Sequence, residues 1–140
     1  MRLLALDIGE KRIGIASSES GIFASPHSVL HRKSKQEDFA RLQQIIEALQ
    51  IERIVIGLPY SVSGQAEMGP QARRVKRYAD ALATAVTVPL AFFDESYSTV
   101  DAATKLSQAG KKKITIDAAA AAVILQSYID SMNPSSLCIA

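Results

Sequence analysis

The chain has 140 residues, of which 48% are hydrophobic, and a formal net charge of +2. This length suits one buried core, so we expect a single domain over residues 1–132 and a flexible tail over 133–140. No run approaches the roughly 18 apolar residues of a membrane-spanning helix, and the first residues enter a predicted strand without a leader. We therefore expect a cytoplasmic protein with no membrane partner. The single cysteine, Cys138, excludes an internal disulfide and has no metal-ligand spacing with either histidine.

The first predicted element is a hairpin. An almost wholly apolar run leads to Asp7, which is typical of a strand buried on both faces. We expect Gly9 to supply unusual backbone angles at the turn and residues 12–16 to form the second strand. Asp7 then lies where a buried strand ends, an edge at which such folds gather their chemistry. Taken alone, however, an Asp before a Gly is better explained as a turn residue.

Residues 21–32, which include a proline, suit a third, irregular strand. Apolar residues at three- and four-residue steps predict an amphipathic helix over residues 36–50. The apolar run 53–58 then predicts another buried strand, stopped by Pro59. A helix between two buried strands implies a crossover, so we expect this strand to run parallel to the first.

A polar loop over residues 59–69 follows, and a helix is predicted over residues 70–86 with a proline in its first turn. Basic residues gather in three places: Arg32, Lys33 and Lys35; Arg73, Arg74, Lys76 and Arg77; and residues 111–113. The run on the second predicted helix is either a solvated face or a site for phosphates.

In the last third, residues 89–93 predict a further buried strand, followed directly by Asp94 and Glu95. A helix start at residue 98 predicts a helix to about residue 108, and residues 111–113 form a basic linker. Asp117 then begins an alanine-rich helix to residue 132, which packing against a sheet would stabilise. The order predicts an α/β fold with a mixed sheet and packed helices.

Three acids, Asp7, Glu95 and Asp117, should meet at the carboxyl edge of the central strands. Converging carboxylates repel one another unless a cation joins them, and hard oxygen ligands select Mg²⁺ or Mn²⁺. Such a site suits phosphodiester hydrolysis. Taken singly, Asp117 is equally well explained as a helix N-cap and Glu95 as a solvated loop acid.

Several segments of the chain form a set of motifs in a fixed order, which are residues 7–16, 56–59, 63–64, 69–72, 94–95, 98–99 and 116–126. With these motifs the chain resembles the YqgF-type family over nearly its whole length. That family has a ribonuclease-H-like fold, which implies a five-stranded mixed sheet with helices on both faces. It is described as a nuclease of pre-16S ribosomal RNA and, from fold relationship, as Holliday-junction-resolvase-like.

The resemblance implies a Mg²⁺-dependent nuclease, with Mn²⁺ as an alternative ion, acting in 5′-end maturation of 16S rRNA. Its implied catalytic and metal-binding residues are Asp7, Glu95 and Asp117. Its implied nucleic-acid-binding residues are Lys11, Arg12, Ser61, Ser63, Arg73, Arg74 and Arg77. Two positions depart from the family pattern: Ser63 replaces an Asp in the loop, and Ser96 replaces an Arg that would contact phosphate.

Three alternatives stay open. A resolvase of branched DNA shares the same chemistry but needs two sites on a symmetric dimer, so both a monomer and a homodimer are considered. Phosphotransfer or ATP hydrolysis is suggested by the Asp-x-Gly hairpin, but the turn lacks a hydroxyl residue, and the chain is short for closing over a nucleotide. A non-catalytic RNA-binding module needs only the basic clusters.

Overall fold

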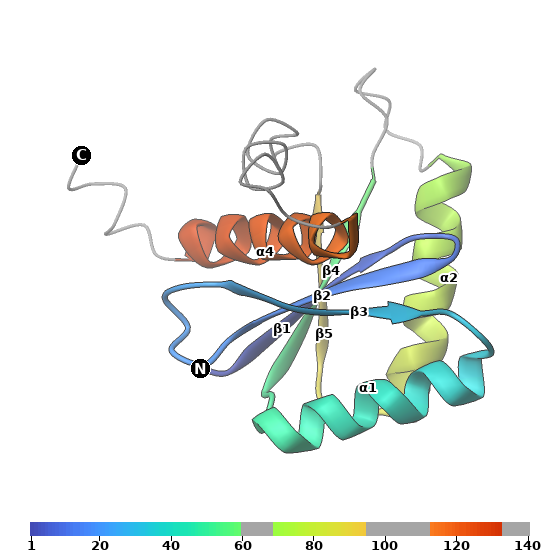
Figure 1. The fold of residues 1–140 in the computed structure, drawn as a ribbon, viewed down its shortest axis with the longest axis horizontal. Helices are drawn as coiled ribbons and strands as arrows, with labels where there is room; N and C mark the ends of the chain where they lie inside the picture. The colour runs from blue at the N-terminus through green and yellow to red at the C-terminus, as the bar shows by residue number, and fades with distance from the viewer. Residues whose placement is uncertain (60–68, 95–112, 133–140) are drawn as a thin grey trace.

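A computed structural model describes residues 1–59, 69–94 and 113–132. The described chain forms a five-stranded sheet with the strand order β3-β2-β1-β4-β5 and helices packed on it (Figure 1). The strands are β1 (Leu3–Ile8), β2 (Arg12–Ser18), β3 (Ser25–His31), β4 (Arg53–Leu58) and β5 (Leu90–Asp94). The helices are α1 (Lys35–Leu49), α2 (Pro70–Ala85) and α4 (Lys113–Met132).

The sheet is mixed, as predicted. The first three strands form an antiparallel meander, in which β1 pairs with β2 and β2 with β3. Strand β4 returns parallel to β1 after the crossover through α1, and β5 returns parallel to β4 after α2. The carboxyl ends of β1, β4 and β5 therefore point to one edge of the sheet, which is where the sequence places the candidate acids.

The two faces of the sheet bury different kinds of side chain. Large aliphatic residues such as Leu4, Leu6 and Ile56 pack with α1 and α2 on one face. On the other face, the alanine-rich helix α4 packs on Ala5 and other small or branched residues. Helices thus cover both faces (Figure 1), and the small side chains let the backbone of α4 approach the sheet closely.

Strand β5 was predicted to be buried, and this was wrong. None of its residues is fully buried, and Phe92 keeps 37% of its surface exposed. The reason is its place in the sheet: β5 is an edge strand with a neighbour on one side only. An apolar run of five residues does not reveal whether its strand is central or at an edge.

Helix α4 begins earlier than predicted. It starts at Lys113, so this residue of the expected basic linker is helical and Asp117 is the fifth helical residue. The expectation that Asp117 begins or caps the helix was therefore wrong. The predicted helix over 98–108, most of the polar loop and the expected tail lie outside the described residues.

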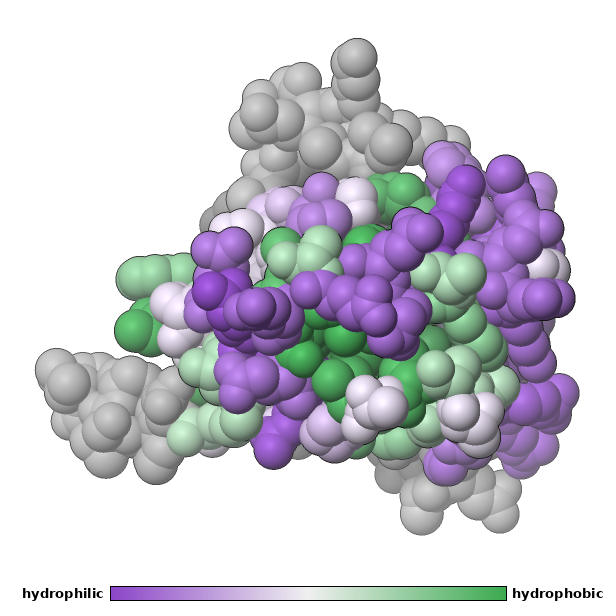
Figure 2. All heavy atoms as spheres, turned by 90° about the horizontal axis from the view of Figure 1, so that it is seen from below, coloured by the Kyte–Doolittle hydropathy of each residue, from purple (hydrophilic) through white to green (hydrophobic). Residues whose placement is uncertain are grey.

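Polar side chains are unevenly spread over the surface. Seen from below, hydrophilic residues gather on the right-hand side of the molecule, where α2 and the beginning of α1 lie (Figures 1 and 2). Within the described ranges, no helix combines the length and the apolar character needed to cross a membrane.

Candidate active site

The turn between β1 and β2 depends on Gly9. Its N–H donates a hydrogen bond to the carbonyl of Arg12 at 2.9 Å, and a Cβ on Gly9 would lie only 2.8 Å from that same oxygen. The predicted unusual backbone angles were wrong, because among the described glycines only Gly21 has a positive φ. Glycine is needed at position 9 for close approach.

Asp7 lies on the face of the sheet that α4 covers. Side chains alternate along a strand, and Leu3 and Ala5 of β1 both belong to the cluster packed on α4. Asp7 continues that series, and its partner across the ladder is Gly14 of β2. The carboxylate therefore lies beside a residue that has no side chain.

Gly14 is also where α4 meets the sheet. A Cβ built on Gly14 would overlap the backbone carbonyl of Asp117. Because Gly14 is the cross-strand partner of Asp7 and also touches Asp117, it places the two acids at one corner of the sheet. The helix that carries Asp117 therefore contacts β2 at the residue that is paired with Asp7.

Asp117 forms an ion pair with Arg12, whose Nε lies 3.0 Å from Oδ2. This oxygen is nevertheless buried and accepts no hydrogen bond from the described residues, so the contact is electrostatic and lacks hydrogen-bond alignment. A pocket of about 310 Å³, lined by residues 9–12 and Asp117, opens beside it. A buried carboxylate oxygen without a donor is the kind of ligand that suits a divalent cation.

The acidic cluster is incomplete within the described residues, where no group of three His, Cys, Asp or Glu side chains could hold a metal ion. Asp7 and Asp117 both border Gly14, the first as its cross-strand partner and the second through its backbone carbonyl. Glu95 follows β5 directly in the sequence and lies outside the described residues, as do Ser61 and Ser63.

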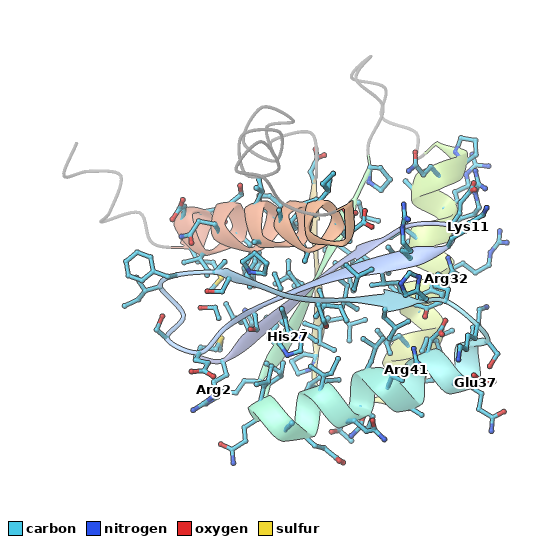
Figure 3. All side chains as sticks on the ribbon, viewed as in Figure 1. Arg2, Lys11, His27, Arg32, Glu37 and Arg41 are labelled. Carbon is cyan, nitrogen blue, oxygen red and sulfur yellow. The ribbon has the colours of Figure 1, made fainter. Side chains whose placement is uncertain are left out.

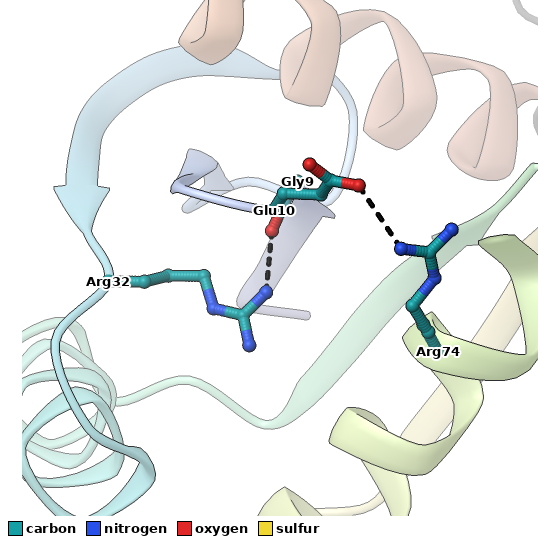
Figure 4. Close-up of polar contacts among 4 residues, drawn as sticks. All are labelled: Gly9, Glu10, Arg32 and Arg74. Carbon is teal, nitrogen blue, oxygen red and sulfur yellow. Dashed lines mark hydrogen bonds and ion pairs between the residues drawn. The ribbon is translucent and has the colours of Figure 1, made fainter.

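The cations predicted to bind nucleic acid are divided between the hairpin and α2. Lys11 lies at the tip of the hairpin (Figure 3), while Arg12 turns to Asp117. On α2, Nη1 of Arg74 lies 3.1 Å from Oε1 of Glu10, which links the helix to the turn (Figure 4). Arg74 and Arg77 line a second pocket, and Arg73 is exposed on the same helix.

Arg32 supports the turn from the other face of the sheet. Its Nη1 donates to the carbonyl of Gly9 at 2.7 Å (Figure 4), and its guanidinium lies 4.5 Å from the centre of the Tyr78 ring.

The Tyr78 hydroxyl donates to the buried carboxylate of Asp38 at 3.1 Å. Burial, then the charge and the hydrogen bond of Asp38, raise the pKa of Tyr78 far above its usual value, against a smaller opposite effect of Arg32. The hydroxyl therefore stays protonated and keeps its hydrogen bond.

Comparison with known proteins decides the family. The model of the family described as "RuvX: Holliday junction resolvase" matches residues 1–131. The chain belongs to the RuvX family. It is similar to a protein of Syntrophomonas wolfei named "Putative pre-16S rRNA nuclease", with 42% identity over 93% of this chain and 94% of the relative. A protein of the same name from Thermoanaerobacter pseudethanolicus is 38% identical over 95% of this chain and 99% of the relative.

Solved structures show that this RuvX chain has the ribonuclease-H-like fold of the resolvases, as the family resemblance predicted. A Thermus thermophilus RuvC in complex with a Holliday junction substrate matches with a TM-score of 0.61 and 14% identity, over 95% of this chain and 96% of that one. The Fowlpox virus resolvase in complex with Holliday junction DNA matches with a TM-score of 0.57 and 12% identity, over 94% and 99% of the two chains. The description of the RuvX family thus names an activity on phosphodiester bonds, and this chain has the fold of the solved resolvases.

Sequence reasoning gave no role to Asp38 of this RuvX protein, predicted Tyr78 only as a buried residue of the helix, and counted Arg32 and Lys35 only as members of a basic cluster. The basic run that contains Arg32 and Lys35 was visible in the sequence, directly after the third strand. Its importance became apparent only when the fold brought it beside α2 and the hairpin turn. A run of basic residues at the end of a strand that follows a candidate catalytic hairpin is the sequence signal that could have predicted this role.

Proposed function

We propose that this RuvX protein is a divalent-metal-dependent nuclease that hydrolyses a phosphodiester bond of precursor 16S rRNA during 5′-end maturation in the cytoplasm. The observation that carries the proposal is the corner formed by Asp7, Gly14 and Asp117, with the buried Oδ2 of Asp117 3.0 Å from Nε of Arg12. The names of the relatives at 42% and 38% identity support the choice of RNA.

The residues fit a divalent cation. Asp7 and Asp117 would hold it with Glu95, which either completes the ligand set or orients the attacking water. A bound Mg²⁺ or Mn²⁺ supplies electrostatic stabilisation of the charge that develops on the phosphate and lowers the pKa of water. Oxygen ligands of this kind favour Mg²⁺ and Mn²⁺ over softer metals.

The cations of the chain bind and orient the strand. Arg12, at the mouth of the pocket beside Asp117, donates to a phosphate oxygen of the RNA, and Lys11 at the hairpin tip contacts the backbone further along. Arg12 is held beside Asp117 by its ion pair before RNA arrives, and it would exchange this carboxylate for a phosphate oxygen of the strand. Ser61 and Ser63 belong to the loop that we propose closes over the strand.

The test is cleavage of a precursor 16S RNA fragment by the purified protein with Mg²⁺, with Mn²⁺ and with EDTA. We expect cleavage with either metal, none with EDTA, and none by Asp7→Asn in any condition. Asp80→Asn is the matched control, because Asp80 lies on α2 and pairs with Lys76 away from the site. Equal cleavage by the wild type and by folded Asp7→Asn protein would overturn the proposal.

Cleavage of branched DNA is the second candidate, because the family description names a Holliday junction resolvase. The same preparation should be offered a four-way DNA junction beside the RNA. Paired cuts in opposed strands, with the RNA left intact, would favour this alternative, and such cuts require two sites on a dimer. We expect the RNA to be the better substrate.

A further inference from the structure

A second pocket lies on the opposite side of the hairpin from the acids. It has a volume of about 390 Å³ and lies on the α1 and α2 face, with Ile8 and Tyr78 among its lining residues. Four cations line it: Arg32, Lys35, Arg74 and Arg77. A pocket of this size accommodates a small ligand or one or two groups of a larger one.

The charge of the pocket selects an anion. Among the described residues that line it, Glu10 is the only acid, and it pairs with Arg74 at 3.1 Å, where the Glu10 side chain is 79% and the Arg74 side chain 60% exposed. An exposed ion pair of this kind is weak and is readily exchanged for another partner. An entering anion therefore meets three further cations besides Arg74.

Arg32 is already oriented within this pocket. The Gly9 carbonyl holds Nη1 at 2.7 Å and the Tyr78 ring lies 4.5 Å beneath the guanidinium. A guanidinium has five N–H donors in one plane, so most of its hydrogen-bonding capacity remains for a phosphate. Tyr78 is itself fixed by its hydrogen bond to Asp38 and by an edge contact with Phe39.

The hairpin turn joins this pocket to the candidate active site. Gly9 and Glu10 line both pockets, so the turn forms the wall between them. A strand that crosses the tip of the hairpin reaches the acids on one side and the four cations on the other. Lys11 lies at that tip, between the two positions (Figure 3).

We infer that this basic pocket binds phosphate groups of the RNA strand next to the bond that is cleaved. The inference rests on the proposed nuclease function for its choice of ligand. The pocket lies on the hydrophilic side of the molecule, where α2 and the start of α1 are found (Figures 1 and 2). The pocket adds Arg32 and Lys35 to the cations that sequence reasoning assigned to nucleic acid.

The test is the salt dependence of RNA binding, measured by fluorescence anisotropy of a labelled precursor 16S fragment in EDTA. Lys35→Ala combined with Arg77→Ala removes two exposed cations of the pocket. We expect weaker binding and a slope of log K against log salt that is shallower by about 0.7 for each lost phosphate contact with single-stranded RNA. Arg41→Ala combined with Lys76→Ala is the matched control, because neither residue lines the pocket, and it should keep the wild-type slope.

Three outcomes separate the pocket from its alternatives. If Lys35→Ala with Arg77→Ala leaves the slope of log K against log salt unchanged while Mg²⁺-dependent cleavage is intact, the pocket does not bind RNA phosphates. The proposed nuclease function is then still supported. A shallower slope in protein that never cleaves supports RNA binding by the pocket while the nuclease function fails. Saturable binding of a nucleoside monophosphate that requires Lys35 and Arg77, with an unchanged RNA slope, overturns the inference in favour of a free nucleotide.

Discussion

Arg12 and Asp117 form an ion pair that joins the first residue of β2 to α4, with Nε 3.0 Å from the buried Oδ2. Arg12 therefore stands where a metal ion would approach that oxygen. A cation already beside a carboxylate repels a second cation, so the resident arginine should weaken metal binding until RNA draws it away. On the proposed nuclease function, we expect the ion pair to couple metal binding to RNA binding.

The first prediction follows from this coupling. Arg12→Gln removes the positive charge and should tighten Mn²⁺ binding by about fivefold, which corresponds to roughly 1 kcal/mol for a partly solvated pair of charges. The same variant should bind RNA more weakly. Calorimetric titration with Mn²⁺ measures the first effect and anisotropy the second.

Arg41→Gln is the control for Arg12→Gln, since Arg41 lies on α1 and lines neither pocket. It should leave Mn²⁺ affinity unchanged. Weaker Mn²⁺ binding by Arg12→Gln would show that the arginine supports the metal site, contrary to the prediction.

The second prediction concerns Gly14, where a Cβ would overlap the backbone of α4. Backbone cannot rotate away as a flexible side chain can, so Gly14→Ala must push α4 from the sheet. We expect the free energy of unfolding to fall by about 1–3 kcal/mol, as for other overpacked positions. Because Asp117 moves with the helix, Mn²⁺ affinity should fall as well.

Gly69→Ala tests whether any Gly-to-Ala change has this effect. A Cβ there meets nothing within 4 Å. Gly69→Ala should lower the free energy of unfolding by less than Gly14→Ala does, and it should leave Mn²⁺ affinity unchanged. If Gly14→Ala has wild-type stability and metal affinity, the close contact with Asp117 does not position the acid.

Local pattern was enough to predict much of this fold. The apolar run that ends at Pro59 predicted strand β4 over the observed residues 53–58, and the apolar stripe of α2 is buried as expected. Exposure of β5 and the start of α4 were mispredicted, because they depend on strand order and on contacts with the sheet. Residues 7 and 117 both border Gly14, while the meeting of the three acids stays a prediction. This link through Gly14 was not visible in the sequence, because a glycine indicates a close approach only when its neighbour is known.

The third prediction concerns the pH dependence of stability through Tyr78. At pH 7, Tyr78→Phe removes the donor to Oδ2 of the buried Asp38, whose Oδ1 keeps its hydrogen bond from the Lys33 N–H, and it should lower the free energy of unfolding by about 1–3 kcal/mol. Because the pKa of Tyr78 is raised in the folded protein, its contribution is complete below the ordinary value of 10.0 and is lost as the pH rises above it. The difference in free energy of unfolding between wild type and Tyr78→Phe should therefore shrink by up to about 1.4 kcal/mol for each pH unit above that value.

Urea denaturation followed by circular dichroism at pH 7, 9, 10 and 11 measures this convergence. The comparison between wild type and Tyr78→Phe cancels the titration of lysines that both proteins share. A stability difference that stays constant over this pH range would contradict the raised pKa of Tyr78.

The last prediction concerns Gln126, which ties α4 to the segment between β2 and β3. Its Oε1 accepts from the N–H of Ala24 at 2.9 Å, and its Nε2 donates to the carbonyl of Ile22 at 3.0 Å. Gln126→Ala removes both hydrogen bonds and should cost about 0.5–1.5 kcal/mol for each. Local opening of this segment should become more frequent, so hydrogen exchange of residues 19–24 should speed up.

Hydrogen exchange read out by mass spectrometry tests this directly, with Gln44→Ala on the exposed side of α1 as the control. The control should leave exchange in residues 19–24 at the wild-type rate. Faster exchange in Gln126→Ala with unchanged RNA cleavage would show that these hydrogen bonds act independently of the corner formed by Asp7, Gly14 and Asp117, as expected because Gln126 lies more than two helical turns beyond Asp117 on α4. Unchanged exchange would mean that packing of the segment on α4, and not the side chain of Gln126, holds it in place.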